Sequence, residues 1–355
     1  MRAWTVTTAG EPMVEQRRAE VPGAGEVIVA IAGCGVCHTD LGFHFDGVPT
    51  RRALPLTLGH EISGVVVETG PGAERWRGQA VVVPAVMPCG ECAACKAGRG
   101  PVCPRQIFPG NDVHGGFASH VRVPARGLCP VPDLGDRRRN PANVDLATLA
   151  VLADAVTTPF QAIARSGLGA GDLAVVVGAG GVGGFAVQIA AARGAHVVAI
   201  DVDPARLELV ARHGAGCTLH AAQLDFKALR STLRGFAKEH GVDGFRWRLF
   251  ECSGTTAGQS TAFGLIEPGS WLSVIGFTPH KLELRLSNVM AFDATVQGNW
   301  GCLPELYPQA LELVLQGKVQ LGPFTERRPL ASINQSFQDV HERRTTARLV
   351  LCPEG

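Results

Sequence analysis

Val175-Val176-Val177-Gly178-Ala179-Gly180-Gly181-Val182-Gly183 is the stretch that decides the fold of the second half of this 355-residue chain. It is a G-x-G-x-x-G pattern that follows a buried-type β-strand and opens a helix, the context that a dinucleotide-binding fingerprint requires. Gly178 permits the tight turn, Gly180 lets the backbone approach a pyrophosphate, and Gly183 lets the helix pack on the strand. The N-terminal amides of the helix then face the phosphates. We expect cofactor contacts from Gly178, Gly180, Gly181, Val182 and Gly183.

Asp201 ends the next expected strand, Val197 to Asp201. It lies at about the ~20-residue offset at which a carboxylate hydrogen-bonds the ribose hydroxyls of the adenosine. Because a carboxylate repels a 2′-phosphate, the sequence favours NAD over NADP. Asp203 and Arg206 keep NADP open, and a simple loop cap is the alternative role for Asp201.

Strand, loop and helix alternate from Leu173 onward, which is typical of a doubly wound parallel sheet. The expected strands are 174–177, 196–200, 248–251 and 271–275, and the expected helices are 181–193, 204–213 and 256–265. The first 130 residues instead contain short β-branched runs bounded by glycine and proline, namely 27–31, 64–68, 80–83 and 120–123. These runs predict a compact β-rich domain or partly open barrel.

The pattern between Asn143 and Arg165 is helical, so we place a domain boundary there. Residues 1–154 are expected to form the first, catalytic domain and residues 155–298 the nucleotide-binding domain. Residues 299–355, with a helix at 303–315 and an apolar run at 347–351, are expected to rejoin the first domain. The sequence thus predicts an α/β protein with a β-rich domain and a parallel sheet.

Lysine plus arginine (33) nearly balance aspartate plus glutamate (32), so no basic field attracts a nucleic acid or an anionic membrane. Residues 1–11 have no apolar signal region, and the most apolar window, 146–164, is interrupted by Asp154 and Pro159. We therefore expect a soluble, cytoplasmic protein whose partner is a small-molecule substrate.

Four of the eleven cysteines, Cys89, Cys92, Cys95 and Cys103, fall within one short loop. Four thiolates can close a tetrahedron around zinc, which leaves no position for a substrate, so this zinc should be structural. Chance clustering or an iron–sulfur cluster is the alternative. A nucleic-acid-binding zinc ribbon is disfavoured because no basic, aromatic-rich surface accompanies the loop.

Cys37-His38-Thr39-Asp40 and Gly59-His60-Glu61 provide a second set of metal donors. An open, catalytic zinc needs a third protein ligand, and Asp154 is a carboxylate in an otherwise apolar segment, where burial is costly unless the charge is paired or metal-bound. Cys34 and Cys129 are rival donors. The alternative for the pair itself is that Cys37 is a buried small hydrophobe and His60 a hydrogen-bonded core histidine.

The neighbouring polar residues suggest supporting roles. Asp40 could orient the His60 imidazole, and Glu61 could be either an occasional fourth ligand or a hydrogen-bond partner of the ligands. Thr39 can pass a proton but cannot act as a base alone. His38 is the imidazole nearest to the pyrophosphate side.

Together these motifs resemble the zinc-dependent medium-chain dehydrogenases, the alcohol dehydrogenases. The resemblance rests on segments 35–40 and 59–61, the four-cysteine loop, 115–118, the glycine fingerprint and Asp201. It implies a GroES-like catalytic domain completed by the C-terminal tail, a Rossmann domain between them, NAD, and two zinc ions per subunit. It also implies catalytic zinc ligation by Cys37 and His60, substrate binding by Thr39, Gly276 near the nicotinamide, and a homodimer or tetramer joined through a Rossmann edge strand.

Two positions depart from the family pattern. Asp154 stands where many alcohol dehydrogenases have a cysteine ligand, and Gly42 stands where the family's relay histidine is usual. The proton could leave through His44, through the cofactor ribose or directly to water.

A closer resemblance, in 105–118 and 124–132, is to members that oxidise a secondary cyclic alcohol carried on an acyl-CoA thioester in aromatic catabolism. It implies phosphate contacts by Arg51, Arg52 or Arg105. The alternatives are a small-alcohol or polyol dehydrogenase of the same family, or a non-catalytic relative that senses NAD.

Overall fold

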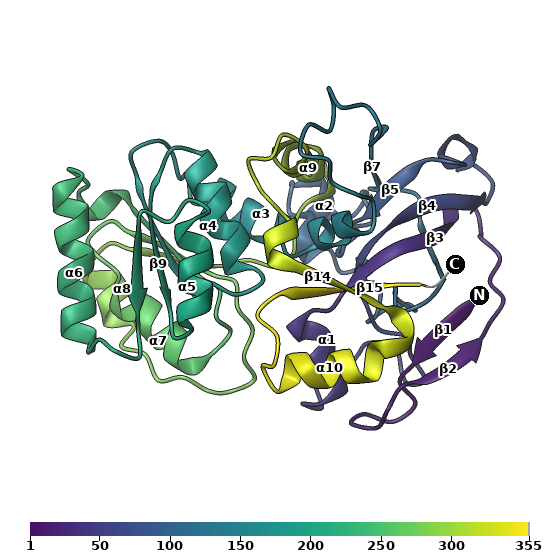
Figure 1. Cartoon of the computed structure of the whole chain (residues 1–355), viewed down its shortest axis with the longest axis horizontal. Helices are drawn as coiled ribbons and strands as arrows, with labels where there is room; N and C mark the ends of the chain where they lie inside the picture. The colour runs from purple at the N-terminus through teal and green to yellow at the C-terminus, as the bar shows by residue number, and fades with distance from the viewer. Residues whose placement is uncertain (354–355) are drawn as a thin grey trace. The chain divides into compact units, whose positions relative to one another are not determined.

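The computed structural model describes residues 1–353 and divides the chain into two compact units. Unit 1 comprises Met1–Thr157 and Gly301–Gly355, and unit 2 comprises Thr158–Trp300. The purple N-terminal strands and the yellow C-terminal segment in Figure 1 therefore belong to one unit. The sequence-based boundaries, after residues 154 and 298, lie within a few residues of this division.

Unit 2 is built on a six-stranded parallel sheet in the order β10-β9-β8-β11-β12-β13. Relative to the first strand of the unit, this is the 3-2-1-4-5-6 order of the doubly wound Rossmann fold, which binds ligands where the order reverses, at the carboxyl ends of β8 and β11. The strands are β8 (Leu173–Val177), β9 (His196–Asp201), β10 (Cys217–His220), β11 (Trp247–Glu251), β12 (Trp271–Val274) and β13 (Thr295–Gly298).

Side-chain caps and apolar faces explain the helices of unit 2. Asp203 accepts a hydrogen bond from Ala205 N–H at the start of α5, whose first residue is Pro204, and Thr255 accepts one from Gly258 N–H at α7. The helices are α3 (Thr157–Arg165), α4 (Gly183–Ala192), α5 (Pro204–Ala211), α6 (Phe226–Glu239), α7 (Thr256–Gly264) and α8 (Ser287–Ala291).

The sequence analysis did not identify α6, β10 or β13. The α6 helix carries a detectable signal, because Leu229, Leu233 and Ala237 recur every four residues and are all buried. By contrast, β10 and β13 are four-residue strands at the two edges of the sheet and are mostly half-buried or exposed. Edge strands such as these lack the long apolar run that marks a central strand.

Unit 1 contains a seven-stranded, mainly antiparallel sheet in the order β14-β15-β3-β4-β5-β7, with β6 also paired to β3. The ten-residue β3 lies at its centre, and its Val27, Val29 and Ile31 side chains pack into one buried core. The strands of the unit are β1 (Arg2–Thr5), β2 (Val14–Arg17), β3 (Glu26–Gly35), β4 (Glu61–Thr69), β5 (Ala80–Val83), β6 (His120–Pro124), β7 (Cys129–Pro130), β14 (Thr325–Pro329) and β15 (Arg348–Cys352).

The C-terminal segment completes this sheet. Strand β15 pairs antiparallel with β3, with Val350 opposite Gly35 and Leu351 opposite Cys34, and β14 adds in parallel to β15. The helices of unit 1 are α1 (His38–His44), α2 (Ala93–Lys96), α9 (Tyr307–Leu315) and α10 (Ile333–His341). Unit 2 has one short 3-10 helix among its described residues, η4 (Gly244–Arg246), and those of unit 1 are η1 (Glu74–Trp76), η2 (Gly100–Val102), η3 (Thr148–Ala153), η5 (Pro304–Leu306), η6 (Gly322–Phe324) and η7 (Leu330–Ser332).

The helix expected from Asn143 to Arg165 is wrong as a single element. The chain forms the 3-10 helix η3, leaves helical geometry at Asp154 (φ −142°, ψ −58°) and begins α3 at Thr157. Pro159 explains the restart, because proline has no N–H to donate and is tolerated only in the first turn of a helix. The break places Asp154 at an irregular position rather than on a helical face.

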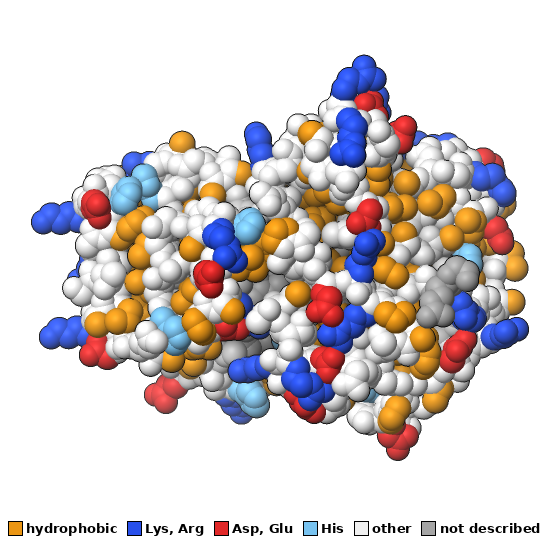
Figure 2. All heavy atoms as spheres, viewed as in Figure 1, with side chains coloured by type: hydrophobic (Ala, Val, Ile, Leu, Met, Phe, Trp, Pro, Cys, Tyr) orange, Lys and Arg blue, Asp and Glu red, His pale blue; other side chains and the backbone are white. Residues whose placement is uncertain are grey.

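The charge and hydropathy of the chain agree with this architecture. Within residues 1–353, no helix is both long enough and apolar enough to span a bilayer. Basic and acidic side chains are interspersed on the face shown in Figure 2.

Candidate active site and metal centres

Cys37 stands at the point where β3 ends and α1 begins. It is the N-cap of α1, and its N–H donates to Asp40 Oδ2 at 3.1 Å, which holds the first turn. This cap explains why a helix forms in a region where the sequence predicts only strands. The Cys37 Sγ is 3.6 Å from Thr39 Oγ1, and the residue is only 6% exposed.

His60 is oriented by the same aspartate. Its Nδ1 lies 3.2 Å from Asp40 Oδ1, and that oxygen also accepts the Gly59 N–H at 3.1 Å. The Phe108 ring packs edge-on against the imidazole, with 4.8 Å between centroids. With Nδ1 occupied by Asp40, Nε2 is the nitrogen available to a metal.

Asp154 closes the donor set. Its Oδ2 is 3.7 Å from Cys37 Sγ and 3.5 Å from His60 Nε2. One donor atom from each of Cys37, His60, Glu61 and Asp154 lies within 4.8 Å of the others. The rivals Cys34 and Cys129 are buried and are not part of this group within the described residues.

The electrostatics of this pocket match a bound divalent cation. Burial alone would lower the pKa of His60, but Asp40 and Cys37 raise it well above its ordinary value. A thiol and the three carboxylates of Asp40, Glu61 and Asp154 thus lie around one imidazole, and a buried excess of negative charge is stable only when a cation balances it. Sulfur, imidazole nitrogen and carboxylate oxygen are the ligands of catalytic zinc sites, so the residues fit this ion.

The four cysteines of the loop lie together as one closed site. Neighbouring sulfurs are 3.4 Å (Cys92 to Cys95), 3.6 Å (Cys92 to Cys103) and 3.9 Å (Cys89 to Cys95) apart. A tetrahedron with Zn–S bonds of about 2.3 Å has sulfurs about 3.8 Å apart, so the loop fits one zinc. The Glu91 N–H lowers the pKa of Cys89 to about 6, which favours the thiolate.

The glycine loop has the steric constraints that its sequence implies. Gly178 has φ +90°, and a Cβ there would lie 2.6 Å from Ser253 Cα. A Cβ on Gly183 would lie 1.7 Å from the Gly178 carbonyl oxygen. A Cβ on Gly180 would meet only Arg206, at 3.5 Å, so this position is open for a ligand to approach.

The Asp201 carboxylate is held by hydrogen bonds from three backbone N–H groups, one of them in this loop. Its Oδ2 accepts the Ala179 N–H at 2.6 Å, and its Oδ1 accepts the N–H groups of Val202 and Asp203 at 2.7 and 2.9 Å. A carboxylate offers about four lone-pair sites, so capacity for a ribose hydroxyl remains. Gly276 packs against the loop after β11, where a Cβ would lie 2.2 Å from Gly254 N.

Comparison with known proteins places this geometry in a family. Residues 23–133 match the family model of the alcohol dehydrogenase GroES-like domain, and residues 181–316 match that of the zinc-binding dehydrogenases. An alcohol dehydrogenase of Geobacillus stearothermophilus is 30% identical over 330 residues, which are 92% of this chain and 91% of that protein. The chain belongs to the zinc-dependent medium-chain alcohol dehydrogenase family.

Other members show the range of this family. L-galactonate-5-dehydrogenase of Escherichia coli is 28% identical over 327 residues, 91% of this chain and 90% of that protein. The crystal structure of galactitol-1-phosphate dehydrogenase from Escherichia coli aligns with a TM-score of 0.88 at 25% identity, covering 99% of this chain and 100% of that chain. The dehydrogenase described here is thus an enzyme of the alcohol dehydrogenase type, and the predicted GroES-like and Rossmann folds are confirmed.

One residue of this dehydrogenase's site was missed by sequence reasoning. Arg348, at the start of β15, donates to both carboxylate oxygens of Glu61, through Nε at 3.0 Å and through Nη2. Burial raises the pKa of Glu61 whereas Arg348 opposes that rise, and Glu61 raises the pKa of Arg348. The only sequence signal was an arginine that opens an otherwise apolar segment, Arg348–Cys352. This pairing favours the supporting role for Glu61 over ligation.

The residues near the expected proton path differ in their exposure to solvent. His38 is exposed and Thr39 half-buried. His44 is buried, with its ring 5.6 Å from that of Phe337, and burial lowers its pKa, which weakens it as a proton acceptor. Gly42 leaves no imidazole at the usual relay position.

Gly183 and Gly180 differ in the space available for a side chain, and this difference can be tested by substitution. Gly183→Ala should lower the free energy of unfolding by about 2 kcal/mol or more, because the new methyl group meets a backbone carbonyl. Gly180→Ala should stay within about 0.5 kcal/mol of the wild type. Urea unfolding followed by circular dichroism tests both variants, and equal losses would contradict the loop geometry.

Proposed function

We propose that this dehydrogenase oxidises a secondary alcohol to a ketone with a catalytic zinc held by Cys37, His60 and Asp154. The convergence of these three donors is the observation that carries the proposal. When bound, zinc supplies Lewis acidity that lowers the pKa of the substrate hydroxyl, and NAD supplies the hydride acceptor. The four-cysteine loop holds a second, structural zinc in the proposal.

The chain's own residues have distinct roles in the proposed reaction. Thr39, beside Cys37, hydrogen-bonds the substrate hydroxyl and passes its proton onward. Asp40 keeps the His60 ring in the orientation that leaves Nε2 free for the metal. Glu61, neutralised by Arg348, stabilises the segment that carries Asp154.

NAD is the proposed cofactor rather than NADP. The Asp201 carboxylate lies 7% exposed at the end of β9, beside the glycine loop, where a 2′-phosphate would be repelled. The Arg206 guanidinium, which faces Gly180, is 3.5 Å from Asp203 Oδ2 and so is already paired with an acid. In this proposal Gly178, Gly180, Gly181, Val182, Gly183 and Gly276 form the cofactor-contacting loops.

Two substrate classes are compatible with this site. The sequence resemblance suggests 6-hydroxycyclohex-1-ene-1-carbonyl-CoA, which would be oxidised to its 6-oxo product. However, Arg51 pairs with Asp112 at 3.3 Å and Arg105 pairs with Glu91 at 2.8 Å, so two of the expected phosphate contacts are already ion pairs. The names of the similar proteins favour polyols and sugar acids, and a polyol or small secondary alcohol fits at least as well.

A competition assay separates these substrates. The enzyme with NAD should reduce the cofactor, seen as NADH absorbance, with only one class among short secondary alcohols, polyols and cyclic acyl-CoA alcohols at equal concentration. Turnover of the acyl-CoA alcohol alone would support the CoA assignment, and turnover of polyols alone would reject it. Cofactor binding without turnover of any alcohol would instead favour the NAD-sensing alternative.

Removal of the third ligand tests the metal assignment. Asp154→Ala should lose one zinc and reduce kcat/KM by at least about 100-fold, because ligand loss leaves Cys37 and His60 alone on the ion. The exposed Asp46→Ala serves as the matched control and should keep both zinc ions and full activity. Cys103→Ser should lose the other zinc and lower stability. Full zinc occupancy and turnover in Asp154→Ala would refute the assignment.

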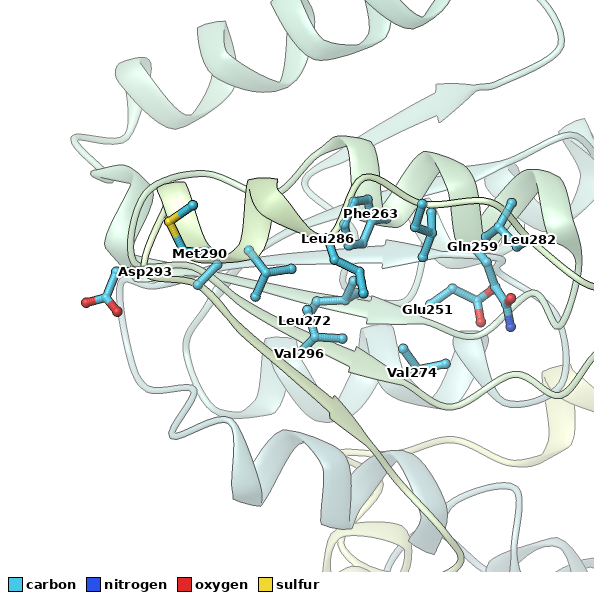
Figure 3. A pocket seen from close by; sticks show the side chains of 13 residues that line it. Glu251, Gln259, Phe263, Leu272, Val274, Leu282, Leu286, Met290, Asp293 and Val296 are labelled. Atoms are coloured by element: carbon cyan, nitrogen blue, oxygen red, sulfur yellow. The ribbon is translucent and has the colours of Figure 1, made fainter.

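We also propose a homo-oligomer joined through the edge of unit 2. Strand β13 is the outermost strand of its sheet, and beside it lies a cavity of about 690 Å³ with apolar walls. Figure 3 shows Glu251 and Gln259 at one end of this cavity and Met290 at the other. Leu286 and Met290 are 70% and 76% exposed, which is unusual for such side chains unless another molecule covers them. A second copy of the chain, pairing edge to edge, would cover both features.

Val296→Lys, on β13, should convert the oligomer to a monomer, because a charge enters the proposed interface. Val14→Lys is a matched control, since both valines are 41% exposed. Size-exclusion chromatography with light scattering measures the mass. A wild-type protein of monomer mass, 37.3 kDa, would contradict the proposed oligomer.

A further inference from the structure

Tyr307 is the chain's one tyrosine and is completely buried at the start of α9. Its hydroxyl donates to the Ala153 carbonyl at 2.5 Å and accepts the Ala85 N–H at 3.2 Å. Thr157 Oγ1 donates to the same Ala153 carbonyl at 3.2 Å. The Ala153 carbonyl therefore has two side-chain donors, from residues on different segments of unit 1.

This carbonyl belongs to the peptide group that directly precedes Asp154. On the other side, the Ala155 N–H donates to Glu61 Oε1 at 2.9 Å, and Arg348 holds Glu61. Both peptide groups that flank Asp154 are thus fixed by side chains. Asp154 itself lies between η3 and α3 in a non-helical conformation, so the positions of its two flanking peptide groups bear directly on the direction of its carboxylate.

We propose that Tyr307 is a positioning residue for the metal ligand Asp154, which it orients by holding the Ala153 carbonyl. The inference rests on the proposed catalytic zinc site. Two residues of the C-terminal segment then support Asp154. Tyr307 holds the peptide group that precedes it in the chain, and Arg348 holds Glu61, which binds the peptide group that follows it. The hydroxyl is the working group, because the aromatic ring by itself would fill the same core volume in phenylalanine.

Tyr307→Phe tests this role in the purified holoenzyme. The variant should release one zinc to a chelator about 10- to 100-fold faster than the wild type, because partners that orient a ligand typically change metal affinity by that factor. After cobalt replaces zinc, the absorption bands of the open, three-ligand site should shift. The kcat should fall while the KM for NAD stays within about twofold.

Two further variants keep the result interpretable. Thr5→Val deletes another buried hydroxyl of unit 1, which hydrogen-bonds Thr57 Oγ1 at 3.1 Å, and this variant should release zinc at the wild-type rate. Thr157→Val removes the second donor to Ala153 and should speed release of the same zinc. If Tyr307→Phe does not fold, the zinc-release rate of Thr157→Val tests the inference instead.

The outcomes are distinct. Wild-type zinc release and an unshifted cobalt spectrum in Tyr307→Phe, or in Thr157→Val where that variant carries the test, would overturn the inference. Equal acceleration in Thr5→Val would also overturn it, because general destabilisation would then explain the effect. A wild-type enzyme that holds only the four-cysteine zinc would refute the proposed catalytic site itself, independently of Tyr307.

Discussion

The structure of unit 1 depends on how it compensates buried negative charge. Cys37, Asp40, Glu61 and Asp154 come together around a single imidazole, and Asp40 and Glu61 are completely inaccessible to solvent. Removing such groups from water costs several kcal/mol per ion unless each is paired. Arg348 satisfies Glu61, whereas Asp40 binds His60 and the Gly59 amide. The sulfur of Cys37 and the carboxylate of Asp154 remain beside the His60 imidazole, and the proposed zinc would balance their charge.

This requirement also accounts for the path of the chain. The cation that neutralises Glu61 comes from β15, which lies 287 residues further along and pairs beside β3. The described C-terminal residues, 301–353, contribute no donor to the candidate metal cluster, yet they supply Arg348 and Tyr307 to its surroundings. The two sequence segments of unit 1, which the Rossmann unit separates, are thus joined by a buried ion pair between Glu61 and Arg348.

Short sequence patterns predict those features of the structure whose residues lie close together in the chain. The four-cysteine loop and the glycine loop each lie within a short segment, so their spacing alone predicts one closed site and one tight turn. The predictions failed where structure depends on a single side chain or on a distant partner. The seven-residue α1 forms because Asp40 caps it, and the helical pattern from Asn143 is broken because Pro159 cannot lie in a helix interior.

The sequence by itself therefore determined the fold class, because strand and helix periodicity and the glycine spacing are local signals, and its motifs carried the resemblance to the family. Only the tertiary structure decided that Asp154, rather than Cys34 or Cys129, meets Cys37 and His60, and that Arg348 and Tyr307 support the site. The physical reason is that contacts between residues far apart in the sequence depend on sheet register and on the irregular backbone at Asp154, neither of which leaves a periodic signal in the chain.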